Sequence, residues 1–213
     1  MNFNFIPSPF NSIEINNKIM LIPKNNKITH TLIWLHDQNQ TSENYINIFN
    51  NNTNSPIPEN IKVIIPSLIS SNKINKNDSN YNIEDIINSV IDIINKEAAL
   101  LEGNYSKIII GGFGQGAILS LNIGLSFEKI LGAIICCSGT LLDKTEINNN
   151  NNNINIFIGY RKNEIDDILN NTLKRIENNK NVEKHIYNNN EHEISKEEYE
   201  DIKKFLTKII NNK

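Results

Sequence analysis

Cysteine, arginine, proline and glycine are scarce in this chain of 213 residues, which contains two cysteines, two arginines, six prolines and nine glycines. The two cysteines are the adjacent Cys136 and Cys137, which excludes a disulfide framework of the kind that holds small secreted domains together. A net charge of −3 and a pI near 5.8 provide no general attraction for nucleic acid or anionic membranes. We therefore expect no nucleic-acid partner.

Long apolar runs are also missing, because no stretch reaches the roughly 20 residues that a membrane-spanning helix needs. The first ten residues lack a basic start followed by a long apolar run, so the sequence predicts no secretory signal. The patterns for myristoylation and prenylation are absent as well. We expect a cytoplasmic protein without stable membrane insertion.

Asparagine and isoleucine are abundant instead, with 42 and 41 residues, far above ordinary usage. This excess is typical of A/T-rich codons. It does not by itself indicate a fold. The length suits one domain over residues 1–213. Six consecutive asparagines at 148–153 are interpreted as an inserted surface loop within that domain.

After residue 30, short apolar segments alternate with segments of helical periodicity. Continuous apolar strands between helices are typical of an α/β protein with a mostly parallel central sheet and helices on both faces. Residues 195–198 (SKEE) predict a capping box, and residues 18–22 predict an additional antiparallel edge strand. Buried strands are expected at 31–35, 61–65, 107–110 and 130–137, and two further strands at 154–160 and 183–187. Helices are expected at 41–50, 82–101, 115–127, 166–178 and 195–210.

The segment KIIIGGFGQGAILSL at 107–121 joins a buried strand to a helix through a glycine-rich turn. It resembles the acyl-protein thioesterase and small carboxylesterase family of α/β-hydrolases, whose nucleophile turn reads G-G-F-S-Q-G-G. The other segments follow in the family's order over about residues 15–210. They are Leu35-His36, Ile61–Pro66, Ile134–Leu142, Ile156–Tyr160 and Tyr187–Phe205.

The resemblance implies an α/β-hydrolase fold and hydrolysis of acyl thioesters on S-acylated proteins, or of small carboxylic esters and lysophospholipids, without a cofactor. In this mechanism a serine on a sharp turn attacks the carbonyl, and a histidine oriented by an acid takes the serine's proton. The serine position is Gly114, which has no side chain to attack with. Glycine also accepts the strained backbone of such a turn, so the exchange removes the reaction and leaves the fold intact.

The histidine and the acid are also assigned by the resemblance. His192 lies five residues after Tyr187, as the family pattern requires, although a solvated loop histidine is the alternative. The acid position falls on Lys162, where a cation would disfavour an imidazolium. Glu164 or Asp166 could replace the missing acid.

The oxyanion loop departs from the family as well, because Asp37 and Asn39 stand at its two glycine positions. An inward Asp37 side chain would add negative charge where negative charge develops during acyl transfer. The oxyanion donors are expected at Gln115, where the helix begins, and at Gln38.

The residues also raise the possibility of a dinucleotide site, a different nucleophile or a metal site. Residues 112–117 fit the dinucleotide pattern G-x-G-x-x-A, but that pattern requires an acidic residue after the next strand, where Cys136, Cys137 and Ser138 stand. Each of those three side chains is a conceivable replacement nucleophile beside the turn. The four histidines, His30, His36, His185 and His192, show no ligand spacing, so no metal is expected.

The sequence therefore predicts a degenerate family member with little or no serine-hydrolase activity. A non-catalytic protein that binds acyl chains or acylated proteins is the second class of function.

Overall fold

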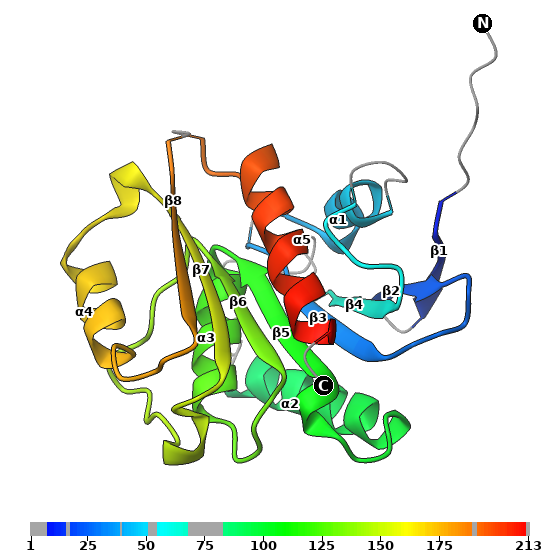
Figure 1. Ribbon diagram of the computed structural model, residues 1–213, viewed down its shortest axis with the longest axis horizontal. Coiled ribbons are helices and arrows are strands. Elements are labelled where there is room, and N and C mark those ends of the chain that lie inside the picture. Colours follow the sequence, from blue (N-terminus) through cyan, green and yellow to red (C-terminus); the bar gives the residue numbers. More distant parts are fainter. Residues whose placement is uncertain are drawn as a thin grey trace, which may run out of the picture.

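A computed structural model describes residues 8–15, 18–38, 40–50, 55–67, 83–188 and 191–211 of the protein. Eight strands form one sheet, with helices on both of its faces (Figure 1). The strands are β1 (Phe10–Ile15), β2 (Lys18–Pro23), β3 (His30–Leu35), β4 (Ile61–Pro66), β5 (Ile108–Phe113), β6 (Ala133–Cys137), β7 (Asn155–Arg161) and β8 (Val182–Tyr187). The α-helices are α1 (Ser42–Phe49), α2 (Ile83–Leu100), α3 (Gln115–Ser126), α4 (Asp167–Arg175) and α5 (Lys196–Asn211), and the 3₁₀ turns are η1 (Tyr105–Lys107), η2 (Asn149–Asn151) and η3 (Lys162–Glu164).

The strand order is β1-β2-β4-β3-β5-β6-β7-β8. Strand β2 runs antiparallel to β1 and β4, and every pairing from β4 to β8 is parallel. The predicted mostly parallel α/β sheet is therefore confirmed. Its parallel strands direct their carboxyl ends to one edge, where α/β proteins place their ligand sites.

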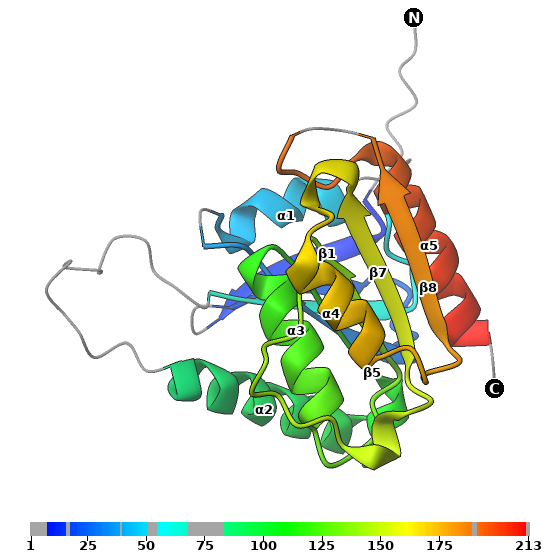
Figure 2. The same ribbon diagram turned by 90° about the vertical axis from the view of Figure 1, so that its left-hand side faces the viewer.

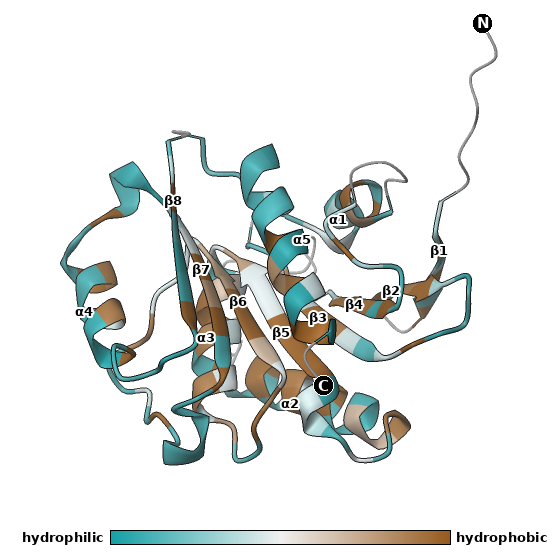
Figure 3. Ribbon diagram, viewed as in Figure 1, coloured by the Kyte–Doolittle hydropathy of each residue, from teal (hydrophilic) through white to brown (hydrophobic). Residues whose placement is uncertain are grey.

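Helices α1 and α5 cover one face of the sheet, and α2, α3 and α4 cover the other, as Figures 1 and 2 show from two sides. Each face buries its own apolar cluster. The central strands β5 and β6 are almost wholly apolar, whereas hydrophilic residues colour much of α4 and α5 (Figure 3). No described helix is long and apolar enough to cross a membrane.

The predicted edge strand at 18–22 is found as β2, but it does not lie at the edge of the sheet. Strand β1 pairs along its whole length and takes the outer place. Only Phe10 of β1 is buried, so this strand lacks the apolar run by which the others were predicted.

The asparagine tract differs from the predicted surface loop at one residue. Asn151 is fully buried at the end of η2, and its amide donates to the carbonyls of Leu125 and Phe127, each at 2.9 Å. These carbonyls lie at the end of α3, where a helix has no backbone donors of its own to offer them. The neighbouring residues Asn150 and Asn152 are exposed, as a loop requires.

The predicted capping box is present in its serine half, because the Ser195 hydroxyl accepts the backbone N–H of Glu198 at 3.1 Å. The Glu198 carboxylate lies within the core and forms an ion pair with Arg161. The start of α5 is thereby tied to the end of β7.

Candidate active site

The turn between β5 and α3 has the backbone form of a nucleophile turn. Gly114, its central residue, has φ 56° and ψ −120°, a region that side chains disfavour. The Gly114 N–H donates to the carbonyl of Cys137 on the neighbouring strand at 3.0 Å, which fixes the turn against the sheet. The geometry that would present a serine is intact, and the residue that occupies it has no side chain.

The Asp37 carboxylate fills the space that a side chain at position 114 would need. A Cβ placed on Gly114 would lie 2.4 Å from Asp37 Oδ1, closer than such atoms approach one another. The same oxygen accepts the backbone N–H of Gln115 at 2.8 Å. This N–H, at the start of α3, is the donor that the sequence assigned to the oxyanion. The inward orientation of Asp37 that was considered as a possibility is therefore the one observed.

His192 lies between two carboxylates. Its Nε2 is 3.7 Å from Asp37 Oδ2, and its Nδ1 is 3.7 Å from Glu164 Oε1. The imidazole also packs against the Phe113 ring, with 4.7 Å between ring centroids. The predicted histidine therefore reaches the turn between β5 and α3, with a carboxylate on each side.

Glu164 is held in place by β6 and β7. One of its oxygens accepts the Ser138 hydroxyl at 2.8 Å and the Arg161 N–H at 2.9 Å. A carboxylate therefore lies beside His192, two residues beyond the acid position that the family pattern gives.

Arg161 connects this acid to the segment that carries His192. Its side chain is 1% exposed and donates hydrogen bonds to Ser138 Oγ and to the carbonyl of Glu193. It also forms the ion pair with Glu198, with an N–O distance of 3.1 Å. The buried Arg161 side chain, at the end of β7, thus contacts both the residue after His192 and the start of α5. Only the scarcity of arginine could have drawn attention to it in the sequence.

The other residues that the sequence predicted for the site are Lys162, Asp166, Gln38 and Asn39. Lys162 is exposed on η3. Asp166 caps α4 by accepting the Leu169 N–H at 2.8 Å. Gln38 is exposed, and its side-chain oxygen accepts the Gln115 amide at 2.8 Å. Asn39 lies outside the described residues.

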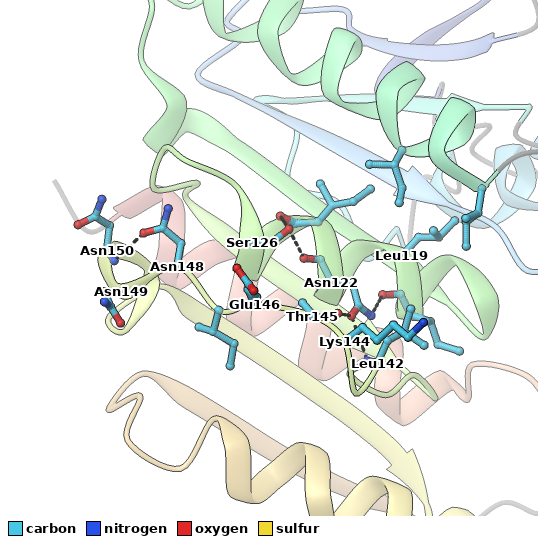
Figure 4. A pocket seen from close by; sticks show the side chains of 15 residues that line it. Leu119, Asn122, Ser126, Leu142, Lys144, Thr145, Glu146, Asn148, Asn149 and Asn150 are labelled. Atoms are coloured by element: carbon cyan, nitrogen blue, oxygen red, sulfur yellow. Dashed lines mark hydrogen bonds between the residues drawn. The ribbon is translucent and has the colours of Figure 1, made fainter.

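An apolar pocket of about 240 Å³ adjoins the turn between β5 and α3. Its lining includes His36, Gln38, Gln115, Ile118, Leu119 and Leu142. A wider pocket of about 820 Å³ shares Ile118, Leu119 and Leu142 with it. Figure 4 shows this wider pocket, with Leu119 and Leu142 toward one end and Asn148, Asn149 and Asn150 at the other.

The alternative thiol nucleophiles are poorly suited to attack. Cys136 and Cys137 are fully buried, and burial raises the pKa of the Cys136 thiol to about 12. Burial raises the pKa of Cys137 well above its ordinary value too. The reactive thiolate is therefore disfavoured at both positions. Ser138 has its hydroxyl engaged with Glu164.

The described residues contain no group of three or more His, Cys, Asp or Glu side chains that could hold a metal ion. For a dinucleotide, the strand beside the glycine turn should end on an acidic residue. That strand is β6, which ends on Cys137 and is followed by Ser138.

Comparison with known proteins identifies the family. The model of the Phospholipase/Carboxylesterase family matches residues 38–210, well over half of the chain. The chain belongs to the phospholipase/carboxylesterase family. A search of curated proteins finds no match.

Several solved structures share the fold of this family member. Esterase PE8 has 14% sequence identity and a TM-score of 0.66, covering 96% of this chain and 100% of that chain. Arabidopsis thaliana SOBER1 has 18% identity and a TM-score of 0.67, covering 85% and 99%. A phospholipase/carboxylesterase from Dyadobacter fermentans has 16% identity and a TM-score of 0.63, covering 97% and 99%. The α/β-hydrolase fold implied by the sequence is therefore confirmed.

Proposed function

We propose that this phospholipase/carboxylesterase family member binds ligands with an apolar chain, such as the acyl chain of an S-acylated protein, and does not hydrolyse esters by the serine mechanism. The observation that carries the proposal is Gly114 at the nucleophile position, with the Asp37 carboxylate lying over it. Loss of the nucleophile in a serine hydrolase lowers turnover by about 10⁶-fold. A carboxylate on the Gln115 N–H also repels the negative charge of an acyl-transfer intermediate.

The pocket beside the turn supports the binding half of the proposal. Its walls come from the apolar side chains of Ile118, Leu119 and Leu142, and the wider pocket continues along α3 (Figure 4). Burial of an alkyl chain there contributes about 0.8 kcal/mol for each CH₂ group. We place this binding in the cytoplasm, where reduced thiols such as Cys136 and Cys137 are stable.

The absence of serine chemistry is tested with a fluorophosphonate probe and a p-nitrophenyl ester. The unaltered protein is expected to take no label and to release no p-nitrophenol above background. A Gly114→Ser variant should remain poorly labelled, because its side chain meets Asp37. A double variant, Asp37→Gly with Gly114→Ser, frees both the space and the Gln115 N–H and should take the label. Labelling of the unaltered protein would contradict the proposal.

Ligand binding is tested by isothermal calorimetry with a peptide that carries a hexadecyl thioether, which cannot be hydrolysed. Two exposed apolar residues give a matched pair: Leu142 lines the pocket and is 45% exposed, whereas Ile186 on β8 is 55% exposed and lines neither pocket. Leu142→Asp should weaken binding by tenfold or more, and Ile186→Asp should leave it unchanged. Equal affinity of both variants would exclude this pocket.

A further inference from the structure

The Asp37 carboxylate stands in the place of the missing serine together with the groups that a covalent reaction would need. We propose that Asp37 is the nucleophile of a different hydrolysis, in which its carboxylate displaces an anionic leaving group from an sp³ carbon of a small apolar alkyl compound. The proposal shares the apolar pocket with the proposed function, but it concerns another substrate and another bond.

The two oxygens of Asp37 have different surroundings. Oδ1 accepts the Gln115 N–H at 2.8 Å, and Oδ2 faces His192 Nε2 at 3.7 Å. The side chain is 9% exposed, so few waters compete for it. A carboxylate fixed through one oxygen presents the other for attack, and carboxylates are established nucleophiles in enzymes.

In the first step, Oδ2 attacks the substrate carbon and forms a C–O bond. The bond to the leaving group breaks, and the leaving group departs as an anion with the bonding electron pair. Asp37 becomes an alkyl ester and loses its charge. No proton transfer is required when the leaving group is a stable anion such as a halide.

In the second step, His192 takes a proton from water, and the resulting hydroxide attacks Cγ of Asp37. The tetrahedral intermediate carries its negative charge on Oδ1, which already lies at the Gln115 N–H. The bond between Cγ and Oδ2 then breaks, and the alcohol leaves with the proton from His192. Asp37 regains its carboxylate by releasing one proton, and one of its oxygens now comes from water.

Glu164 completes this arrangement on the far side of the imidazole. Its Oε1 lies 3.7 Å from His192 Nδ1, and its other oxygen is fixed by Ser138 and by the Arg161 N–H. A carboxylate in this position orients the ring and stabilises the imidazolium that forms during the second step. The hydrogen bonds of a catalytic base are often long without substrate and tighten when it binds, so two separations of 3.7 Å are compatible with this role.

The occupied oxyanion site argues for an sp³ carbon over an acyl carbon. An acyl substrate develops negative charge on its carbonyl oxygen, and the Gln115 N–H that would bind this oxygen is already bonded to Asp37. Displacement at an sp³ carbon creates no oxyanion on the substrate. The same N–H then serves the second step, where the charge develops on Asp37 itself.

The pocket of about 240 Å³ beside the turn indicates the substrate class, because His36 and Gln38, the residues on either side of Asp37, are part of its lining. Ile118, Leu119 and Leu142 suit a short alkyl chain, and the Gln38 and Gln115 side chains at its polar end carry amide N–H groups. Neutral N–H donors suit a departing halide or sulfonate. The described lining of this pocket contains no ionised side chain of Asp, Glu, Lys or Arg that would favour a charged substrate.

The test uses the full chain with 1-bromobutane and with butyl methanesulfonate. The unaltered protein should release bromide, and turnover in heavy-oxygen water should place one heavy oxygen in the peptide that contains Asp37, detected by mass spectrometry. His192→Gln should accumulate a butyl ester on Asp37, because the second step is blocked. Asp37→Asn should lose bromide release, and Asp167→Asn, an exposed carboxylate on α4, should retain it.

The ester trapped in His192→Gln identifies Asp37 as the nucleophile even where Asp37→Asn fails to fold. Absence of both the ester and the heavy oxygen at Asp37, with both probes, would overturn it. Bromide release with the heavy oxygen only in the alcohol over many turnovers, and none in Asp37, would also overturn it. Neither result bears on fluorophosphonate labelling or on the affinity for the thioether peptide, so failure here is distinguishable from failure of the proposed function.

Discussion

The Arg161 guanidinium and the Glu198 carboxylate form an ion pair with an N–O distance of 3.1 Å between side chains that are 1% and 0% exposed. Burial raises the pKa of Glu198, and the charge of Arg161 opposes that rise. The pair joins the end of β7 to the first turn of α5. Because Arg161 also holds Ser138 and the carbonyl of Glu193, the pair supports the segments that position Glu164 and His192.

Replacement of Arg161 by methionine should lower the free energy of unfolding by about 3–5 kcal/mol, because it leaves a buried carboxylate without its partner. Urea denaturation measures this loss. The double variant Arg161→Met with Glu198→Met removes both charges and should recover most of it. A double variant as unstable as the single one would show that the charges themselves are not the cause.

Gly114 and Asp37 should be energetically coupled, since a Cβ at position 114 would lie 2.4 Å from Asp37 Oδ1. Gly114→Ala is expected to destabilise the protein through this clash and through the strain of its positive φ, which costs about 1–3 kcal/mol. In an Asp37→Gly background only the strain remains. A double-mutant cycle on the free energy of unfolding should give a coupling of about 0.5–3 kcal/mol. If the effects of the two substitutions on the free energy of unfolding are additive, the Asp37 carboxylate does not lie over Gly114.

Asn151→Ala should destabilise the protein by about 1–3 kcal/mol, because the buried Phe127 carbonyl loses its amide donor and the Leu125 carbonyl keeps only the backbone N–H of Asn148. Asn150→Ala is the matched control from the same tract. Asn150 is exposed, so its replacement should change stability by no more than about 0.5 kcal/mol. Thermal or urea unfolding of both variants gives the comparison, and equal stability of the two would contradict the buried role.

Cys136 and Cys137 should not react with Ellman's reagent in the folded protein. Burial raises the pKa of Cys136 to about 12, so the thiol stays protonated as the pH rises from 7 to 9. The reaction should therefore follow the rate of unfolding at both pH values and become fast in urea. Rapid modification of the native protein would show that these thiols are reactive in the folded state, and they would again be candidate nucleophiles.

The strands and helices beyond residue 30 could be predicted because apolar residues, isoleucine the commonest of them, fill most buried positions of the parallel strands. Strand β1 could not, since five of its six residues are exposed. The identity of the acid was left open for a different reason. The spacing of the family pattern assigns the acid position to Lys162. In the structure, η3 turns the backbone so that the Glu164 side chain accepts the Arg161 N–H and faces His192. The direction of the Asp37 side chain likewise depends on a contact between residues 78 positions apart.

The single buried asparagine in the tract at 148–153 has a consequence for how this chain tolerates change. A change in the length of a loop would normally move a structural residue out of its place. Here each neighbour of Asn151 in the run is also asparagine. When the run lengthens or shortens by a residue, another asparagine can enter the buried position and donate to the end of α3. Repetition thus lets the length of the tract vary while the contact that it supplies is kept.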